Sequence, residues 1–262
     1  MHLVSMPDKS FINMLNQVSS MQITVNGAKG KMGQAVVNHV QTTDGLTLVD
    51  QVDLGDSLSS SLSENPADIV VDFTRPEIRM ENVKNILFGG AAAVVGTTGF
   101  TPENLKQIEE WVNETGKGCF IAPNFIIGNV LMQQFAKKAA EFYENVEIIE
   151  YHHENKVDYP SGTAVKTAEL MSEVKKGYNS NTNDKVANVE GSRGGDFNGI
   201  KLHSVRMPGF IASQEVLFGN VGEYLTIRHD NIDRVAYMPG IVAAAKHIKD
   251  RAELIYGLEH IL

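Results

Sequence analysis

The chain has 262 residues, of which 42% are hydrophobic and 21% charged, a balance typical of a folded globular protein. Its formal net charge of −9 disfavours nucleic acid as a partner, and no apolar run approaches the roughly 20 residues that span a bilayer. The single cysteine, Cys119, excludes an intramolecular disulfide and suits a reducing, cytoplasmic compartment. It lies in the apolar run GCFIA, which indicates a buried strand residue rather than a reactive thiol.

Residues 1–20 are expected to form an N-terminal extension outside the fold, because the first strand-like run begins at Met21. They resemble neither a secretory signal nor a transit peptide. Residues 21–26 then predict a buried strand, 32–41 a helix and 46–53 a second strand. The alternation continues with strands at 67–73, 91–96 and 118–123 and helices at 76–88 and from 101 onward. Apolar strands that alternate with helices predict an α/β fold, a Rossmann-type doubly wound parallel sheet.

The rest of the chain predicts an α+β domain with a mixed sheet. Helices are expected at 130–143 and 161–174, a polar loop at 175–196, strands at 146–152, 200–207, 213–219 and 223–229, and a last helix at 240–256. We therefore expect a dinucleotide-binding domain at 21–125 and 235–262, and a substrate-binding and oligomerisation domain at 126–234.

A glycine-rich turn follows the first expected strand. Gly27, Gly30 and Gly33 form a G-x-x-G-x-x-G pattern, in which glycine permits a tight turn, close approach to a pyrophosphate and close packing of helix on strand. The helix that opens there presents free N–H groups to the phosphates. The pattern predicts a nicotinamide dinucleotide site, NADH or NADPH.

An acid about 20 residues further on is part of such a site, because its carboxylate accepts the ribose hydroxyls. Asp53, at the end of the second strand, is the first candidate and Asp50 the second. Leu54 stands where an arginine would bind a 2′-phosphate, which favours NADH, although Lys29 or Lys31 can partly compensate.

The densest polar stretch of the chain is 151–164 (YHHENKVDYPSGTA). Lys156 and the amides of a helix that opens at Ser161 predict an anion site, and a histidine near neutral pH can supply a proton. Adjacent histidines on a strand point to opposite faces, so only one of His152 and His153 can face one pocket. A metal site from these histidines, Glu154 or Asp158 fits no common zinc spacing, so no metal is expected.

Five segments together resemble the 4-hydroxy-tetrahydrodipicolinate reductase family, in its order and approximate spacing. They are GAKGKMG at 27–33, DFTRPE at 72–77, GTTGF at 96–100, APNF at 122–125 and EYHH…KVD…PSGTA at 150–164. The resemblance runs from about Met21 to the C-terminus, and the stretch 152–164 is its most specific part.

The resemblance implies roles for single residues. It makes His152 the proton donor and acceptor and Lys156 a second proton donor. It assigns the binding of the substrate's carboxylates to His153, Gly162 and Thr163. We add Ser161, because its amide is expected at the same helix N-terminus. It assigns the cofactor to Gly27, Ala28, Lys29, Gly30, Lys31, Met32, Asp53, Gly96, Thr97, Thr98, Ala122, Pro123, Asn124 and Phe125.

The activity implied is NAD(P)H-dependent reduction of 4-hydroxy-tetrahydrodipicolinate, a cyclic dicarboxylate, to tetrahydrodipicolinate in diaminopimelate and lysine biosynthesis. A homotetramer built through the sheet of the second domain is implied as well. Two alternatives stay open, a dehydrogenase of acidic amino acids and a non-catalytic NAD sensor. Arg206 is expected at either the site or an interface, and no role is assigned to Arg228 or His229.

Overall fold

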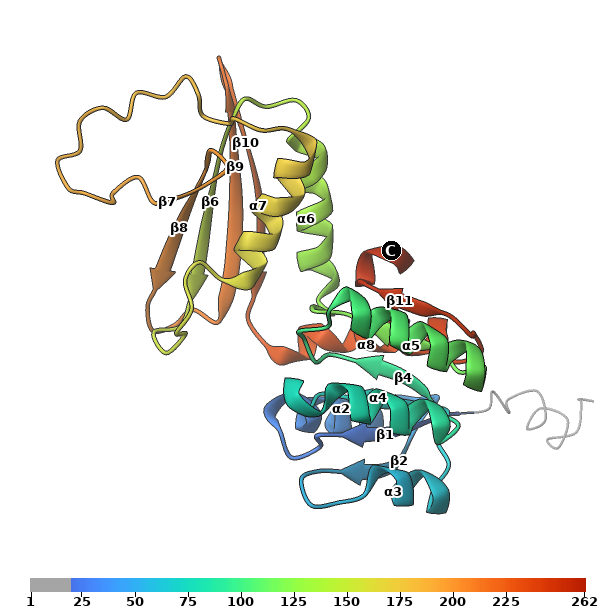
Figure 1. The fold of residues 1–262 in the computed structure, drawn as a ribbon. Coiled ribbons are helices and arrows are strands. Elements are labelled where there is room, and N and C mark those ends of the chain that lie inside the picture. The colour runs from blue at the N-terminus through green and yellow to red at the C-terminus, as the bar shows by residue number, and fades with distance from the viewer. Residues whose placement is uncertain (1–19) are drawn as a thin grey trace, which may run out of the picture. The chain divides into compact units, whose positions relative to one another are not determined.

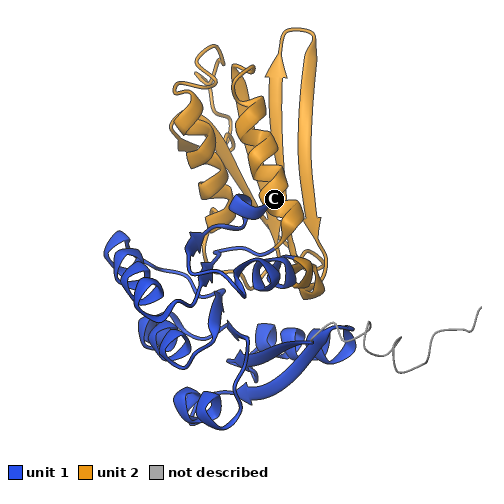
Figure 2. Ribbon diagram, turned by 90° about the vertical axis from the view of Figure 1, so that its right-hand side faces the viewer, with its two compact units in different colours: residues 1–125, 240–261 blue, residues 126–239, 262 orange. Residues whose placement is uncertain are grey.

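The computed structural model describes residues 20–262, so the expected N-terminal extension lies outside the described residues except for Ser20. The chain forms two compact units (Figure 2). Residues up to 125 together with 240–261 form unit 1, and residues 126–239 form unit 2. The return to unit 1 therefore falls after Pro239 rather than at 235. It occurs where Gly240 packs so closely on Phe125 that a Cβ would lie 2.0 Å from the Phe125 carbonyl oxygen.

Unit 1 is built on a six-stranded sheet with the order β11-β5-β4-β3-β1-β2, in which every pairing is parallel. The strands are β1 (Met21–Asn26), β2 (Leu46–Val52), β3 (Ile69–Asp72), β4 (Ala92–Val95), β5 (Cys119–Ile121) and β11 (Leu254–Tyr256). Its helices are α2 (Lys31–Thr42), α3 (Leu58–Glu64), α4 (Arg79–Phe88), α5 (Pro102–Thr115) and α8 (Met238–Ile248), with the short turns η1 (Pro76–Ile78) and η3 (Leu258–Ile261) (Figure 1). The predicted Rossmann-type α/β sheet is confirmed.

Two short elements of unit 1 differ from the expectation. The last helix, α8, ends at Ile248, and β11 then pairs Leu254 with Cys119 of β5. The mostly polar segment 249–253 separates the helix from β11, and the sheet gains an edge strand. Helix α3 was not predicted; Ser57 caps it by accepting a hydrogen bond from the Ser60 amide at 3.2 Å.

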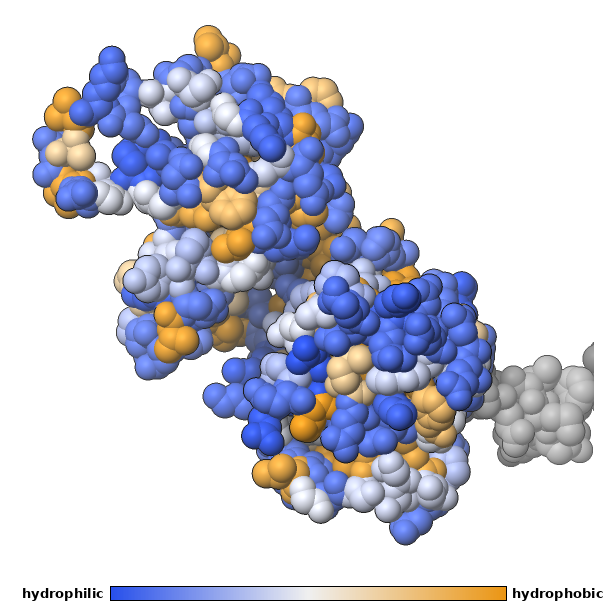
Figure 3. Space-filling model, in the orientation of Figure 1, coloured by the Kyte–Doolittle hydropathy of each residue, from blue (hydrophilic) through white to orange (hydrophobic). Residues whose placement is uncertain are grey.

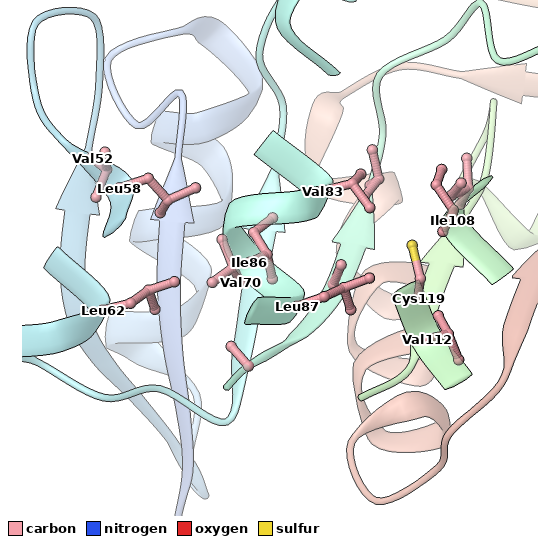
Figure 4. Close-up of a cluster of buried hydrophobic side chains, with 14 residues drawn as sticks. Val52, Leu58, Leu62, Val70, Val83, Ile86, Leu87, Ile108, Val112 and Cys119 are labelled. Carbon is pink, nitrogen blue, oxygen red and sulfur yellow. The ribbon is translucent and has the colours of Figure 1, made fainter. Parts of the chain in front are cut away.

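A cluster of buried apolar side chains from strands and helices fills one side of this sheet (Figure 4). It includes Val52, Leu58, Leu62, Val70, Val83, Ile86, Leu87, Ile108, Val112 and Cys119. Continuous burial of Ile69, Val70 and Val71 at 0% exposure shows that helices cover both faces of the sheet at β3.

Cys119 is fully buried on β5, as expected, and burial raises the pKa of its thiol far above the ordinary value. Because the thiolate is the reactive form, we expect Ellman's reagent at pH 8 to leave native Cys119 unmodified. The same reagent should release one equivalent of chromophore per chain in guanidinium chloride, since the chain has one cysteine. Rapid modification of the native protein would contradict the buried position.

Unit 2 is a mixed five-stranded sheet with the order β10-β9-β6-β8-β7. The strands are β6 (Asn145–His152), β7 (Gly195–Phe197), β8 (Ile200–Arg206), β9 (Ala212–Asn220) and β10 (Glu223–Asn231). Strand β6 pairs parallel with β8 and antiparallel with β9. Helices α6 (Ile127–Ala139) and α7 (Gly162–Val174) contribute to one apolar core with β6, β8 and β9, and the turn η2 (Arg234–Tyr237) follows β10.

Alternation along β6 decides what faces these helices. Val146 and Ile148 lie in the core with α6 and α7, so Glu150 and His152 continue on the same face at the end of the strand. Among the helices of residues 20–262, none is long and apolar enough to cross a membrane. On the face in Figure 3, apolar side chains are scattered among polar ones on both units.

Candidate active site

The glycine turn stands at the carboxyl end of β1, where the order of the parallel sheet reverses between β1 and β3. Gly27 has φ +83°, and a Cβ there would lie 2.7 Å from the Phe73 carbonyl oxygen. A Cβ on Gly33 would lie 2.0 Å from the Gly27 carbonyl oxygen. Glycine is therefore required at both positions, at Gly27 by the backbone angle and at Gly33 by the packing of α2 on the turn.

The N-terminus of α2 fits a pyrophosphate. Gly30 is its N-cap residue and offers no capping side chain. Within residues 20–262, the amides of Lys31, Met32 and Gly33 have no hydrogen-bond partner. Three free donors at the positive end of a 12-residue helix form a site for an anion. Lys29 and Lys31 are exposed beside this turn.

Asp53 follows β2 and is held beside the glycine turn. Its carboxylate accepts hydrogen bonds from the amides of Lys29 at 2.6 Å and Leu54 at 2.7 Å. These two bonds, that from Lys29 first, hold the pKa of Asp53 below its usual range, so the group stays ionised. Asp50, the second candidate, instead accepts a hydrogen bond from Ser61 of α3 at 2.6 Å and is not part of the turn.

The other expected cofactor segments begin at the carboxyl ends of β4 and β5. Gly96, Thr97 and Thr98 follow Val95, and Ala122 to Phe125 follow Ile121. The expected cofactor residues of unit 1 thus lie at the ends of β1, β2, β4 and β5, which meet at one edge of a parallel sheet.

Asp72, to which the sequence analysis gave no role, links the segments at this edge of the sheet by hydrogen bonds. It ends β3 at 1% exposure and accepts hydrogen bonds from Asn26 of β1 at 2.7 Å and from Thr97 at 3.2 Å. Asn82 of α4 donates to the same carboxylate at 2.9 Å. The available signal was an acid that ends an otherwise apolar strand, IVVD.

In unit 2, His152 is the last residue of β6 and its Nδ1 atom is hydrogen-bonded to Glu150, two residues earlier on the same face. Glu150 is 1% exposed and also accepts two hydrogen bonds from Arg206 of β8, at 2.7 and 2.8 Å. Burial alone would raise the pKa of Glu150, but hydrogen bonds from His152, Arg206 and Ser204 outweigh it and lower the pKa to about 2.

The N-terminus of α7 is a second candidate anion site. Ser161 caps the helix by accepting from the Ala164 amide at 3.2 Å, and its own amide donates to Glu150 at 3.3 Å. Within the described part of the chain, the Gly162 and Thr163 amides have no hydrogen-bond partner. A Cβ on Gly162 would meet no atom within 4 Å, so this end of the helix is open.

The loop between β6 and α7 contains the other expected residues. Lys156 pairs with Asp158 at 2.6 Å, and that hydrogen bond lowers the pKa of Asp158. Arg206 donates to the Asp158 carbonyl oxygen at 2.8 Å. His153 is exposed beyond the strand. The structure therefore brings His152, Ser161 and the loop of Lys156 together through Glu150 and Arg206, which places Arg206 at the site.

The remaining polar residues considered in the sequence lie on β10. Arg228 pairs with Asp230 at 2.9 Å and with Glu215 at 3.2 Å, which raises its pKa. The ring of His229 packs against Gly128 of α6, and burial lowers its pKa. Among residues 20–262, no group of three or more His, Cys, Asp and Glu side chains could hold a metal ion.

The parallel sheet, its glycine turn and the ionised acid beside it define the class of protein, a dinucleotide-dependent oxidoreductase with a second, α+β unit. The chain belongs to the dihydrodipicolinate reductase family. Residues 21–125 match the description "Dihydrodipicolinate reductase, N-terminus" and residues 128–262 match "Dihydrodipicolinate reductase, C-terminus".

Named relatives and solved structures agree with this family. The chain is 48% identical over 243 residues to the 4-hydroxy-tetrahydrodipicolinate reductase of Mycolicibacterium vanbaalenii, a match that covers 92% of this chain and 99% of the relative. It is 46% identical over 254 residues to that of Streptococcus pneumoniae, covering 93% and 100%. A dipicolinate-bound dihydrodipicolinate reductase from Paenisporosarcina sp. TG-14 superposes with a TM-score of 0.83 at 37% identity, covering 92% and 99%.

Proposed function

We propose that the chain reduces 4-hydroxy-tetrahydrodipicolinate to tetrahydrodipicolinate with a nicotinamide cofactor, in diaminopimelate and lysine biosynthesis. The observation that supports this best is the construction of unit 2. A histidine fixed by a buried carboxylate ends β6, and the open N-terminus of α7 is hydrogen-bonded to the same carboxylate. This arrangement supports a proton donor beside a carboxylate site, as reduction of a cyclic dicarboxylate requires.

The substrate is held as an anion in this proposal. The free amides of Gly162 and Thr163 donate hydrogen bonds to one carboxylate at the positive end of α7. We propose that Ser161, His153 and Lys156 border the same region; His153 follows the last residue of β6, so the alternation of the strand does not apply to it. The charge of Lys156 strengthens the attraction. The relative from Paenisporosarcina sp. TG-14 was solved with dipicolinate, itself a cyclic dicarboxylate, which supports this class of ligand.

His152 is the proposed proton donor and Lys156 the second. When bound, the reduced nicotinamide supplies a hydride. The substrate loses its hydroxyl as water, so the net change consumes one hydride and one proton. Because Nδ1 of His152 is occupied by Glu150, the Nε2 atom is the one that exchanges the proton. We propose that the residues of unit 1 from Gly27 to Met32, Asp53, and the segments 96–98 and 122–125 bind the cofactor.

We propose that NADH is preferred over NADPH. Asp53 is ionised and repels a 2′-phosphate, and Leu54, 81% exposed, gives that phosphate no cation. Leu54→Arg should raise kcat/KM for NADPH by about tenfold, one favourable ion pair, and leave the NADH value within about twofold. Leu54→Gln is the uncharged control. An unchanged NADPH value in the arginine variant would contradict this role for position 54.

A homotetramer in the cytoplasm completes the proposal. The face of the unit 2 sheet opposite α6 and α7 carries half-buried residues such as Ile149 and Tyr151 of β6 and Leu217 of β9. Val186 and Val189, in the loop before β7, are 86% and 69% exposed. Such apolar area suits contact with further copies of the chain. Light scattering of the pure protein tests the assembly.

A coupled assay tests the activity. A synthase generates the unstable substrate from pyruvate and aspartate semialdehyde, and the loss of NADH or NADPH absorbance is followed separately. We expect oxidation that depends on the synthase and is faster with NADH. Absence of oxidation of either cofactor by folded protein would reject the reductase and leave the acidic amino-acid dehydrogenase to be tested next.

A further inference from the structure

We infer that Glu150 is a positioning residue that orients the proton donor and the carboxylate site together. The inference rests on the proposed function, and it names a buried residue that is not among those assigned to substrate or cofactor. Glu150 acts through two neighbours, the His152 ring and the N-terminal turn of α7, both of which its carboxylate contacts.

Glu150 is a buried carboxylate whose charge is compensated by a neighbouring arginine. It lies on the inner face of β6, between Ser204 of β8 and Gln214 of β9, at 1% exposure. An uncompensated carboxylate at such a position would be strongly destabilising. Arg206 compensates it through two parallel hydrogen bonds, at 2.7 and 2.8 Å, from neighbouring strand β8.

The ionised state of Glu150 fixes the state of the histidine. An ionised carboxylate only accepts hydrogen bonds, so Nδ1 of His152 must carry the hydrogen. The Nε2 atom is then left for the substrate in both protonation states of the ring, and the ring cannot rotate without breaking the bond. His152 is hydrogen-bonded to Glu150 on its own strand, and Glu150 is paired with Arg206 on β8. Arg206 in turn contacts Asp158, the partner of Lys156 in the loop.

The same carboxylate fixes the anion site. Its Oε1 atom accepts a hydrogen bond from the Ser161 amide at 3.3 Å. This bond holds the N-cap residue that precedes Gly162 and Thr163, whose amides have no partner among the described residues. Arg206, while paired with Glu150, also donates to the Asp158 carbonyl oxygen and so restrains the loop of Lys156. One buried ion pair therefore holds the proton donor, the helix N-terminus and the lysine loop in one arrangement.

The test is Glu150→Gln, which keeps the shape of the side chain and removes its charge. We expect kcat to fall by about 10- to 100-fold, the range seen when a group that orients a functional histidine is lost. The pH profile of kcat should change, because the acceptor of the His152 Nδ1–H hydrogen bond has lost its charge. The Kd for dipicolinate should rise by about tenfold, while the Kd for NADH, bound by unit 1, stays unchanged.

Glu173→Gln is the matched control, since Glu173 lies on α7 with its side chain 56% exposed and paired with Lys137. It should behave as the wild type. A folded Glu150→Gln protein with wild-type kcat and an unmoved pH profile would overturn the inference, because a merely structural role leaves the profile in place.

If Glu150→Gln does not fold, Glu150→Asp replaces it. The shorter carboxylate cannot reach all its partners, so a lower kcat and weaker dipicolinate binding are expected, and wild-type values for both would overturn the inference. A wild-type protein without synthase-dependent turnover would instead reject the proposed function.

Discussion

Replacing His152 by asparagine is expected to lower kcat by about 10²- to 10⁴-fold, the usual contribution of a proton-transfer group. Asparagine can keep a hydrogen bond to Glu150 but cannot deliver a proton near neutral pH. The Kd for NADH should not change, because the cofactor residues that we propose lie in unit 1. Stopped-flow single turnovers with excess enzyme would measure the chemical step directly.

His260→Asn is the control for this variant, since His260 is an exposed histidine of η3 in unit 1. It should retain wild-type turnover. A folded His152→Asn protein that turns over at the wild-type rate would remove His152 from the mechanism and leave Lys156 as the remaining proton donor.

Replacing Gly33 by alanine is expected to weaken NADH binding by at least about 100-fold, close to 3 kcal/mol. The new Cβ would lie 2.0 Å from the Gly27 carbonyl oxygen, so α2 must move away from the turn whose free amides receive the pyrophosphate. Isothermal titration calorimetry with NADH measures the loss. Circular dichroism would show that the unit still folds.

Gly195→Ala is the control for the glycine substitution, because a Cβ at Gly195 would approach no atom closer than 3.9 Å. Its NADH affinity should equal that of the wild type. Unchanged affinity in Gly33→Ala would mean that the amides of α2 do not receive the cofactor.

Elements with a strong apolar pattern were predictable from the sequence, whereas β11 and α3, which lack one, were not. Strand β1, its turn and α2 follow from an apolar run and a helical repeat within about 20 residues of chain. Strand β11 has three residues, and only its pairing with β5, more than 100 residues earlier, makes it a strand. Helix α3 contains four serines, residues that favour caps and turns over helices.

Some residues of the candidate site were also predictable from the sequence, and others were not. His152, Lys156 and the start of α7 lie within one local segment, so their types and order predicted an anion site with a proton donor. Glu150 was missed because its partner Arg206 is 56 residues away in sequence, on a strand whose register with β6 no local pattern gives. Asp72 was missed for the same reason, since its partners come from β1, α4 and the segment after β4.

The most direct test of the proposed reduction follows the hydride itself. The synthase-coupled reaction would be run with NADH carrying two deuterium atoms at C4 of the nicotinamide, and the product would be analysed by mass spectrometry. Hydride transfer to the ring predicts tetrahydrodipicolinate that is one mass unit heavier than the product made with unlabelled NADH. Unlabelled product, or deuterated product in a reaction from which the synthase is omitted, would contradict reduction of 4-hydroxy-tetrahydrodipicolinate by this chain.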